Sequence, residues 1–457
     1  MRLELIFILS ILYMIAFFTY AIIEFLSVKK YKRMRIINYV RCMYLLIYGL
    51  IPSIMYMYFY MGGSENRYLN RMDFSYNGIY RLYILFLISI IGYISMNIGY
   101  IIIPKKSKIK NHSNTLITIS AMYKSSIIIL IIGFISLLLW TKAYGSPFDI
   151  IPYAQFLRSG YSPIYNPFTF MKRFCPLLML SSYMLFTIIN VRPKNKQIIP
   201  MYVLFIFSFL WSIVYLLAND GRFGFILFFA TLMLIKMEIN QDKKDQSQTI
   251  KILFKYILFG IIAFILMSLA DGIMGYLSTG VYIPSEVNVN IFELLRDELG
   301  YVILSGQMSI YALENKLAGY RVIEEIFSAI FSIVPDSLIS YPVTSTFAYN
   351  TEIIGNLSGT IPTDLISYSI YNLGVIGVVA IPLLFGIIVR RIQVNIGDKI
   401  SSPYYLVIYI IAAIYSIKAI SHCDSANIIL NIFFVMVGHI IVRIRNIKIK
   451  YRWKNGK

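Results

Sequence analysis

The chain has 457 residues, of which 58% are hydrophobic and only 14% are charged, and its mean hydropathy is +0.70. Soluble domains carry charge on about a quarter of their residues, so this composition excludes a soluble globular protein and indicates a polytopic membrane protein. The formal net charge is +20, but the positive residues stand in short clusters between apolar runs. We therefore interpret them as topology signals and not as a nucleic-acid-binding surface.

Eleven apolar runs are long enough to cross a hydrocarbon core of about 30 Å. The first run is too long for the core of a signal peptide and is followed at once by a basic cluster, so we expect it to stay in the membrane. The predicted spans are 5–27, 38–61, 81–103, 125–142, 174–191, 198–216, 223–237, 252–270, 366–389, 402–420 and 426–444. A half-span inside the long polar loop after the eighth run would make twelve. The prediction is an all-α polytopic membrane protein with about 11–12 transmembrane helices.

Lysine and arginine in the short loops predict the orientation, because cytoplasmic loops retain positive charge. The basic hinges and the basic C-terminal tail fall on one side, and most acidic residues fall on the other. This places the N-terminus and the segment 271–365 outside and the C-terminus inside. Since we find no internal repeat and no linker, residues 1–457 are predicted to form one membrane domain with a large periplasmic loop at 271–365.

Two short helices are predicted within the large loop, at 290–302 and 321–334. In the first, Glu298 falls on the apolar arc, where desolvation would raise its pKa. The second has a polar face and an opposite apolar stripe, which is typical of a helix at a membrane interface. The polar face carries Glu324, Glu325 and Ser328, and the stripe carries Ile323, Ile326, Phe327, Ile330, Phe331 and Val334.

Arginines on the exoplasmic side are informative because the orientation rule disfavours them there. Arg222 has the strongest context, since an Asn-Asp pair precedes it and the helix that it opens offers free N–H groups to a phosphate. Arg158, Arg296 and Arg321 are further candidates for an anion site. The alternatives are an interfacial arginine beside a cap for Arg222, a solvated loop residue for Arg158 and Arg296, and a helix anchor for Arg321.

Two residues are candidates for a general base on their local context. Glu298 lies in an apolar setting that brings a carboxyl pKa toward neutrality, although it could also pair with a cation across the loop. His422 shares a short exoplasmic turn with Asp424, although a histidine in a turn is often a loop or capping residue. The sequence has neither metal-ligand spacing nor a phosphate-loop fingerprint, so no metal and no cofactor are expected.

Three features resemble the Wzy family of O-antigen polymerases, which join lipid-linked oligosaccharide repeat units. They are the many spans with one large exoplasmic loop late in the chain, the NDGRFG turn that opens a span, and the segment 358–386. In that segment Thr363 and Asp364 are followed by Gly374 and Gly377. Ligase-like relatives carry a His-Asn or similar pair where this chain has Thr363 and Asp364, so the departure raises Asp364 as a substitute for a histidine base.

The resemblance implies an inverting, metal-independent glycosyltransferase of GT-C-like fold in the bacterial inner membrane, with its active site facing the periplasm. It would move a growing glycan from one undecaprenyl pyrophosphate onto another lipid-linked repeat unit. Arginines led by Arg222 and Arg296 would hold the pyrophosphate. Glu298, Asp364 or His422 would take the proton of the acceptor hydroxyl. The implied partners are the lipid-linked oligosaccharide, membrane lipid, a chain-length regulator and a flippase, with no nucleic acid.

Two competing functions remain open. A lipid-linked oligosaccharide flippase would show charges midway along spans and interrupted helices in two halves, and neither is evident in the sequence. An O-antigen ligase would differ from a polymerase in its acceptor, which is lipid A-core.

Overall fold

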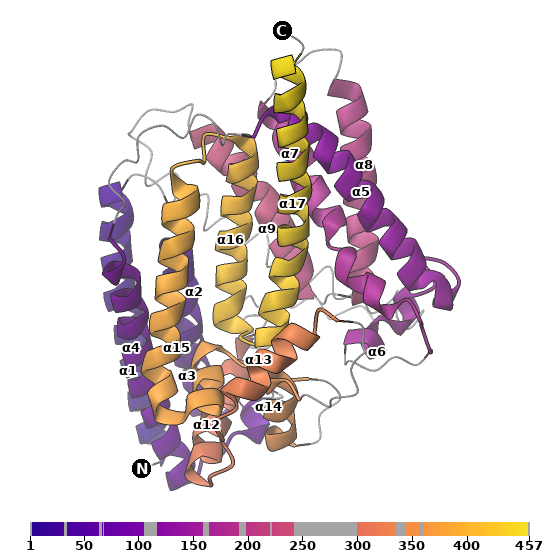
Figure 1. Cartoon of the computed structure of the whole chain (residues 1–457). Coiled ribbons are helices and arrows are strands. Elements are labelled where there is room, and N and C mark those ends of the chain that lie inside the picture. The colour runs from indigo at the N-terminus through magenta and orange to yellow at the C-terminus, as the bar shows by residue number, and fades with distance from the viewer. Residues whose placement is uncertain are drawn as a thin grey trace.

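The structure is a computed structural model. It describes residues 2–31, 34–63, 66, 68–104, 117–158, 164–191, 198–219, 222–241, 299–334, 344–355 and 360–455. All regular elements in these ranges are helices (Figure 1), and ten segments are long and apolar enough to cross a membrane. These ten coincide with ten of the predicted spans, so the prediction of an all-α, multi-pass membrane protein is confirmed. The remaining prediction, 252–270, lies outside the described residues.

The spanning segments form one bundle. They are α1 (Arg2–Tyr31), the continuous run of α2 (Ile36–Leu45), η1 (Leu46–Leu50) and α3 (Ile51–Tyr60), α4 (Tyr76–Ile102), α5 (Ile119–Thr141), the run of η6 (Thr169–Phe174) and α7 (Leu177–Val191), α8 (Ile198–Asn219), α9 (Arg222–Gln241), α15 (Leu365–Gly397), α16 (Pro403–Ser421) and α17 (Ser425–Asn455). The shorter elements are η2 (Leu69–Arg71), η4 (Lys142–Tyr144), η5 (Ile151–Tyr153), α6 (Ala154–Arg158), α12 (Tyr301–Glu314), α13 (Val322–Phe331) and α14 (Thr346–Ile354).

The short helices α12, α13 and α14 gather at one end of the bundle, which we call the short-helix end (Figure 1). The N-terminus lies at this end and the C-terminus at the opposite end. Helix α12 is buried along most of its length, and it packs against α4, α14 and α15. Most of the helix predicted at 290–302 lies outside the described residues, and α12 itself was not predicted, because it has no apolar stripe to mark a boundary between core and surface.

Glycines bring α4 and α15 into backbone contact. A Cβ on Gly99 would lie 2.0 Å from the carbonyl oxygen of Leu383, and one on Gly386 would lie 2.0 Å from that of Met96. Between membrane helices, where lipid removes the hydrophobic driving force, such close approach of small residues supplies the packing energy. The contact fixes α15 against α4, and so it fixes the position of the residues at the start of α15.

Helix α15 is broken at Gly374, whose φ of +57° and ψ of −142° are not helical. A residue with a side chain rarely adopts this conformation, which explains the glycine. The break folds the helix onto itself, since a Cβ on Gly377 would lie 2.0 Å from the carbonyl oxygen of Ser369. The glycine pair noted in the sequence therefore shapes the first turns of this span.

Helix α13 turns its apolar stripe away from the bundle, while Glu325 and Ser328 of its polar face are buried and Glu324 stays exposed. Ile323 is 69% exposed and Ile326, Phe327 and Ile330 are about half exposed, whereas Glu325 is 1% exposed. The buried face packs against α17. An outward apolar stripe is unfavourable in water but suits a helix that lies against lipid.

Candidate functional site

The turn that joins α16 to α17 lies beside the residues that start α15. The backbone N–H of Cys423 donates to the carbonyl oxygen of Thr363 at 2.7 Å, and the Thr363 hydroxyl donates to the carbonyl oxygen of Cys423 at 2.6 Å. This two-way pair brings two predicted base candidates, Asp364 and His422, into adjoining segments, although they are far apart in the sequence.

Asp364 is the N-cap of α15 and is fully buried. Its Oδ1 accepts from the backbone N–H groups of Ile366 at 2.9 Å and Ser367 at 3.1 Å, and also from the Tyr48 hydroxyl. Its Oδ2 accepts from the Ser367 hydroxyl. Burial raises the pKa of Asp364, while these hydrogen bonds act in the opposite direction. The geometry thus gives Asp364 a capping role, and its predicted role as a base stays a prediction.

His422 is half-buried at the end of α16 and stacks on Phe223 with the rings 4.6 Å apart. Its Nδ1 lies 2.9 Å from the Ser421 hydroxyl and 3.3 Å from the Tyr301 hydroxyl, which itself donates to the Ser421 carbonyl oxygen at 2.6 Å. Burial lowers the pKa of His422, and the charge of Lys418 lowers it further. The imidazole is therefore neutral at pH 7, so that it can accept a proton but is a weak base.

A buried pair of carboxyl groups, Glu325 and Asp424, joins α13 to the same turn. Glu325 Oε1 accepts from the Thr346 hydroxyl at 2.5 Å, and Oε2 faces the backbone N–H of Ser425 at 3.4 Å. Asp424 accepts from the backbone N–H groups of Asn427 at 3.0 Å and Phe347 at 3.4 Å. Burial raises the pKa of both carboxyls, and the charge of Asp424 raises that of Glu325 further.

Glu325 is not among the site residues predicted from the sequence. The helical period put Glu325 on the polar face of α13, but a polar face is ordinarily the solvated one. Asp424 was noted only as the neighbour of His422. The strongly amphipathic pattern of α13 is the signal that could have pointed to Glu325, because a helix whose apolar stripe faces outward buries residues of its opposite face, here Glu325 and Ser328.

Arg321 precedes α13 and is 8% exposed. Its Nε donates to Glu324 at 3.0 Å, its Nη2 donates to the Thr344 carbonyl oxygen at 2.6 Å, and its guanidinium carbon lies 4.2 Å from the centre of the Tyr349 ring. Its Nη1 is buried and makes no hydrogen bond with any residue that the structure describes. Arg321 is thus both an anchor of α13 and a buried cation with a spare donor.

The other predicted site residues are placed only in part. Arg222 begins α9 and Arg158 ends α6, as the backbone shows, but their side chains lie outside the described atoms. Arg296 and Glu298 lie outside the described residues.

Three further arginines at the short-helix end tie loops together. Arg71 Nη1 donates to the carbonyl oxygen of Gly355 at 3.1 Å, and Arg173 Nη1 donates to that of Val334 at 2.6 Å. Arg81 pairs with Glu314 at 2.7 Å and with Asp73 at 3.3 Å. Hydrogen bonds and ion pairs to neighbouring loops therefore account for these three arginines, whereas Arg321 Nη1 makes no hydrogen bond with a described residue.

Charges also lie within the spans, which the sequence analysis did not find. Glu24 of α1 is 4% exposed and pairs with Arg41 of α2 at 3.2 Å. Asn38 donates to Glu24, and Arg41 Nε donates to Asn97 of α4 at 2.7 Å. A buried ion pair supported by two amides is tolerated in a membrane because its charges and donors are satisfied by one another.

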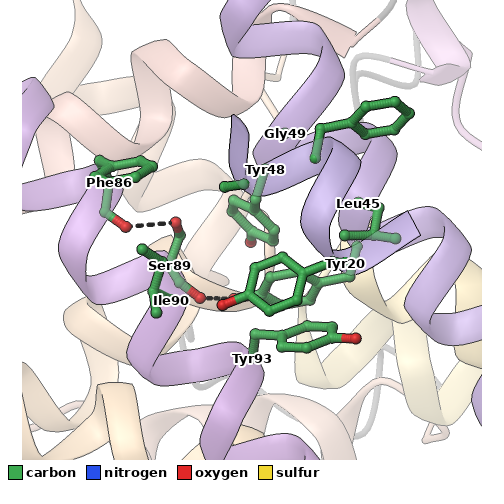
Figure 2. A pocket seen from close by; sticks show the side chains of 11 residues that line it. Tyr20, Leu45, Tyr48, Gly49, Phe86, Ser89, Ile90 and Tyr93 are labelled. Carbon is green, nitrogen blue, oxygen red and sulfur yellow. Dashed lines mark hydrogen bonds between the residues drawn. The ribbon is translucent and has the colours of Figure 1, made fainter. Parts of the chain in front are cut away.

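A small cavity with room for about one water molecule lies among α1, α2, η1 and α4. Figure 2 shows the aromatic rings that line it, among them Tyr20, Tyr48 and Tyr93. The π-helical turn η1 carries Tyr48, which lines the cavity and donates to Asp364, the N-cap of α15. Single π-helical turns are frequent at functional sites.

Within the described ranges, no group of three or more His, Cys, Asp or Glu side chains is placed to hold a metal ion. No protein-family model, no curated protein and no solved structure matches the chain. The function must therefore be inferred from the residues and their geometry.

Proposed function

We propose that this chain is a Wzy-type O-antigen polymerase of the bacterial inner membrane. In this proposal it is a GT-C-like inverting glycosyltransferase that joins undecaprenyl-pyrophosphate-linked repeat units, and its short-helix end faces the periplasm. The observation that carries the proposal is the set of buried polar groups at that end of a multi-pass bundle. It combines the half-buried His422 and the buried carboxyls of Asp364, Glu325 and Asp424 with the buried guanidinium of Arg321, next to α13, whose apolar stripe points away from the bundle.

This arrangement fits the demands of the reaction. Its donor and acceptor are both attached to polyprenyl chains, so the chemistry must take place where lipid meets protein. A diphosphate leaving group needs cationic or N–H donors, which Arg321 supplies and which Arg222, Arg296 and Arg158 are proposed to supply as well. The acceptor hydroxyl needs a proton acceptor, and the candidates are Glu298, Asp364 and His422, together with the acid pair.

The test is to reconstitute the purified protein in liposomes with lipid-linked repeat units and without metal or nucleotide sugar. A ladder of longer glycans on the lipid supports polymerisation, and the absence of any ladder from an otherwise folded protein refutes it. Arg222→Ala is expected to abolish polymer in cells while the protein stays in the membrane. Wild-type chain lengths in that variant would remove Arg222 from the site.

Orientation is tested separately. Single cysteines placed at the short-helix end should react with a membrane-impermeant maleimide added to the periplasm, and cysteines near the C-terminus should not. The reverse pattern would refute the proposed periplasmic active site.

A lipid-linked oligosaccharide flippase is the second candidate, and the Glu24–Arg41 pair favours it because transporters keep charges within their spans. In the same liposomes a flippase would move the lipid-linked unit across the bilayer without forming new bonds, and Glu24→Gln would stop that movement. An O-antigen ligase would be recognised by transfer to lipid A-core in place of a second repeat unit.

A further inference from the structure

The hydrogen bond between Thr346 and Glu325 joins an alcohol to a buried carboxyl group. The Thr346 hydroxyl lies 2.5 Å from Glu325 Oε1, and both side chains are at most 1% exposed. A general base makes the same kind of contact to the hydroxyl that it deprotonates. The threonine thus occupies the position that a substrate hydroxyl would take.

Two buried polar atoms beside this hydrogen bond are unsatisfied within the described part of the chain. Asn372 donates from Nδ2 to the Thr346 hydroxyl at 3.3 Å, but its Oδ1 accepts no hydrogen bond, and the residue is 1% exposed. Arg321 Nη1 is the second; Arg321 is the N-cap of α13, and its carbonyl oxygen accepts from the backbone N–H of Glu325 at 2.9 Å. An orphaned buried polar group destabilises the fold, so the retention of two near the Glu325–Thr346 hydrogen bond points to a ligand that satisfies them.

The two unsatisfied atoms indicate which chemical groups the ligand carries. An amide oxygen seeks a hydroxyl donor, and a guanidinium N–H seeks an anionic oxygen such as that of a phosphate. Arg321 caps α13 and Glu325 lies in its first turns, with the Glu325 backbone N–H bonded to the Arg321 carbonyl oxygen. The start of α13 therefore carries both a phosphate-binding group and a proton acceptor.

We propose that Glu325 is the proton acceptor of this site, with Asn372 orienting the acceptor sugar hydroxyl and Arg321 holding the diphosphate of the donor. The inference rests on the proposed polymerase function and deepens it, because Glu325 is not among the residues predicted from the sequence.

In the proposed step the acceptor O–H bond breaks and its proton passes to the Glu325 carboxylate, while the acceptor oxygen forms a bond to the anomeric carbon of the donor. The bond between that carbon and the diphosphate oxygen breaks, and its electron pair stays on the diphosphate, whose charge Arg321 stabilises. Glu325 then returns its proton to water.

The charged and titratable groups around Glu325 come from each element packed against it. They are Arg321 and Asp424, whose charges act on Glu325 in opposite directions, together with Tyr368 of α15 and Cys423 of the turn. Asp424 is held by backbone N–H groups as the cap of α17. It is therefore the partner that stays in place while Glu325 exchanges its proton.

The test measures the rate of ladder formation in liposomes from pH 5.5 to 8.5 for the wild type, Glu325→Gln and Glu325→Asp. Glutamine keeps an oxygen for the Thr346 hydroxyl but cannot take the proton, so the rate is expected to fall by about 100-fold or more at every pH. Aspartate keeps a carboxyl group on a side chain that is shorter by one methylene, so we expect residual activity with a shifted pH profile. The matched control is Glu352→Gln, an exposed glutamate of α14, which should behave as the wild type.

The outcomes separate the two proposals. A wild-type protein that builds a ladder, with Glu325→Gln within a few-fold of its rate, overturns the role of Glu325 and leaves the polymerase function standing. Equal losses in both Glu325 variants, with lowered thermal stability and an unshifted pH profile, show a structural role and also overturn the inference. A wild-type protein that builds no ladder refutes the polymerase function itself.

Discussion

The cap at Asp364 yields a prediction that separates a structural role from a catalytic one. Asp364→Ala removes the acceptor for two backbone N–H groups and for the Tyr48 hydroxyl, which then lie buried. Loss of an N-cap costs about 1 kcal/mol, and an orphaned buried hydroxyl adds about 1–3 kcal/mol. The variant is therefore expected to be less stable by about 2–4 kcal/mol.

The isosteric change Asp364→Asn should cost much less. Its amide oxygen can replace Oδ1 at the cap, and the new amide nitrogen faces the Ser367 hydroxyl, which can turn to accept from it. If Asp364 is the base, however, Asp364→Asn loses activity while it keeps its stability. The two substitutions thus report on different properties of one carboxyl group.

The assay is the unfolding temperature of the detergent-purified protein, followed by loss of the monodisperse peak after heating. With an unfolding entropy of about 2.1 cal/mol/K per residue over 457 residues, a loss of about 1 kcal/mol in the free energy of unfolding lowers the melting temperature by about 1 °C. We expect Asp364→Ala to melt roughly 2–4 °C lower and Asp364→Asn to melt close to the wild type. The control is Asp398→Ala, at the exposed far end of α15. A wild-type melting temperature for Asp364→Ala, or an equal loss for both substitutions, would refute the capping argument.

Three further outcomes are expected, each checked by the same melting assay. Gly99→Ala should destabilise the fold by about 1–3 kcal/mol, because the added Cβ would lie 2.0 Å from a carbonyl oxygen. The control is Gly319→Ala, whose added Cβ meets nothing within 4 Å. Equal melting temperatures for the two variants would contradict backbone contact between α4 and α15. Gly374→Ala should also cost about 1–3 kcal/mol, since φ is +57° there, and an unchanged melting temperature would argue against the break in α15. In the folded state, burial raises the pKa of Glu325 above its ordinary value of 4.5. Protonated Glu325 therefore contributes to the stability of the fold at low pH, and this contribution is lost as pH rises through the folded-state pKa. Glu325→Gln should therefore gain stability relative to the wild type as pH rises from about 4.5, and a stability difference that stays constant with pH would contradict this.

The sequence predicted the membrane architecture well, because span length and hydropathy are local properties. An apolar run must be long enough for the bilayer and must satisfy its backbone internally as a helix, and neither condition depends on the neighbours. Ten predicted spans accordingly coincide with helices of the structure. The break at Gly374 was not predicted, since a glycine within an apolar run is compatible with a continuous helix.

The candidate site was predicted only where residue type was unusual for its side of the membrane. Arg321 was predicted as an exoplasmic arginine and His422 as a histidine that shares a turn with Asp424; the structure places both at the short-helix end, and their roles stay predictions. Asp364 came from the resemblance, and the structure shows it as a cap.

The amino-acid order by itself determined how many times the chain can cross a bilayer, which stretches do so, and which helix of the large loop is amphipathic. Tertiary structure alone decided that Glu325 and Ser328 of α13 are buried and that Glu325 lies against the turn that carries Asp424. It also decided that the starts of α15 and α17 are held together by Thr363 and Cys423. The reason is that a helical period fixes the relative directions of side chains on one helix, whereas the partner on each side is chosen by packing among segments far apart in the chain.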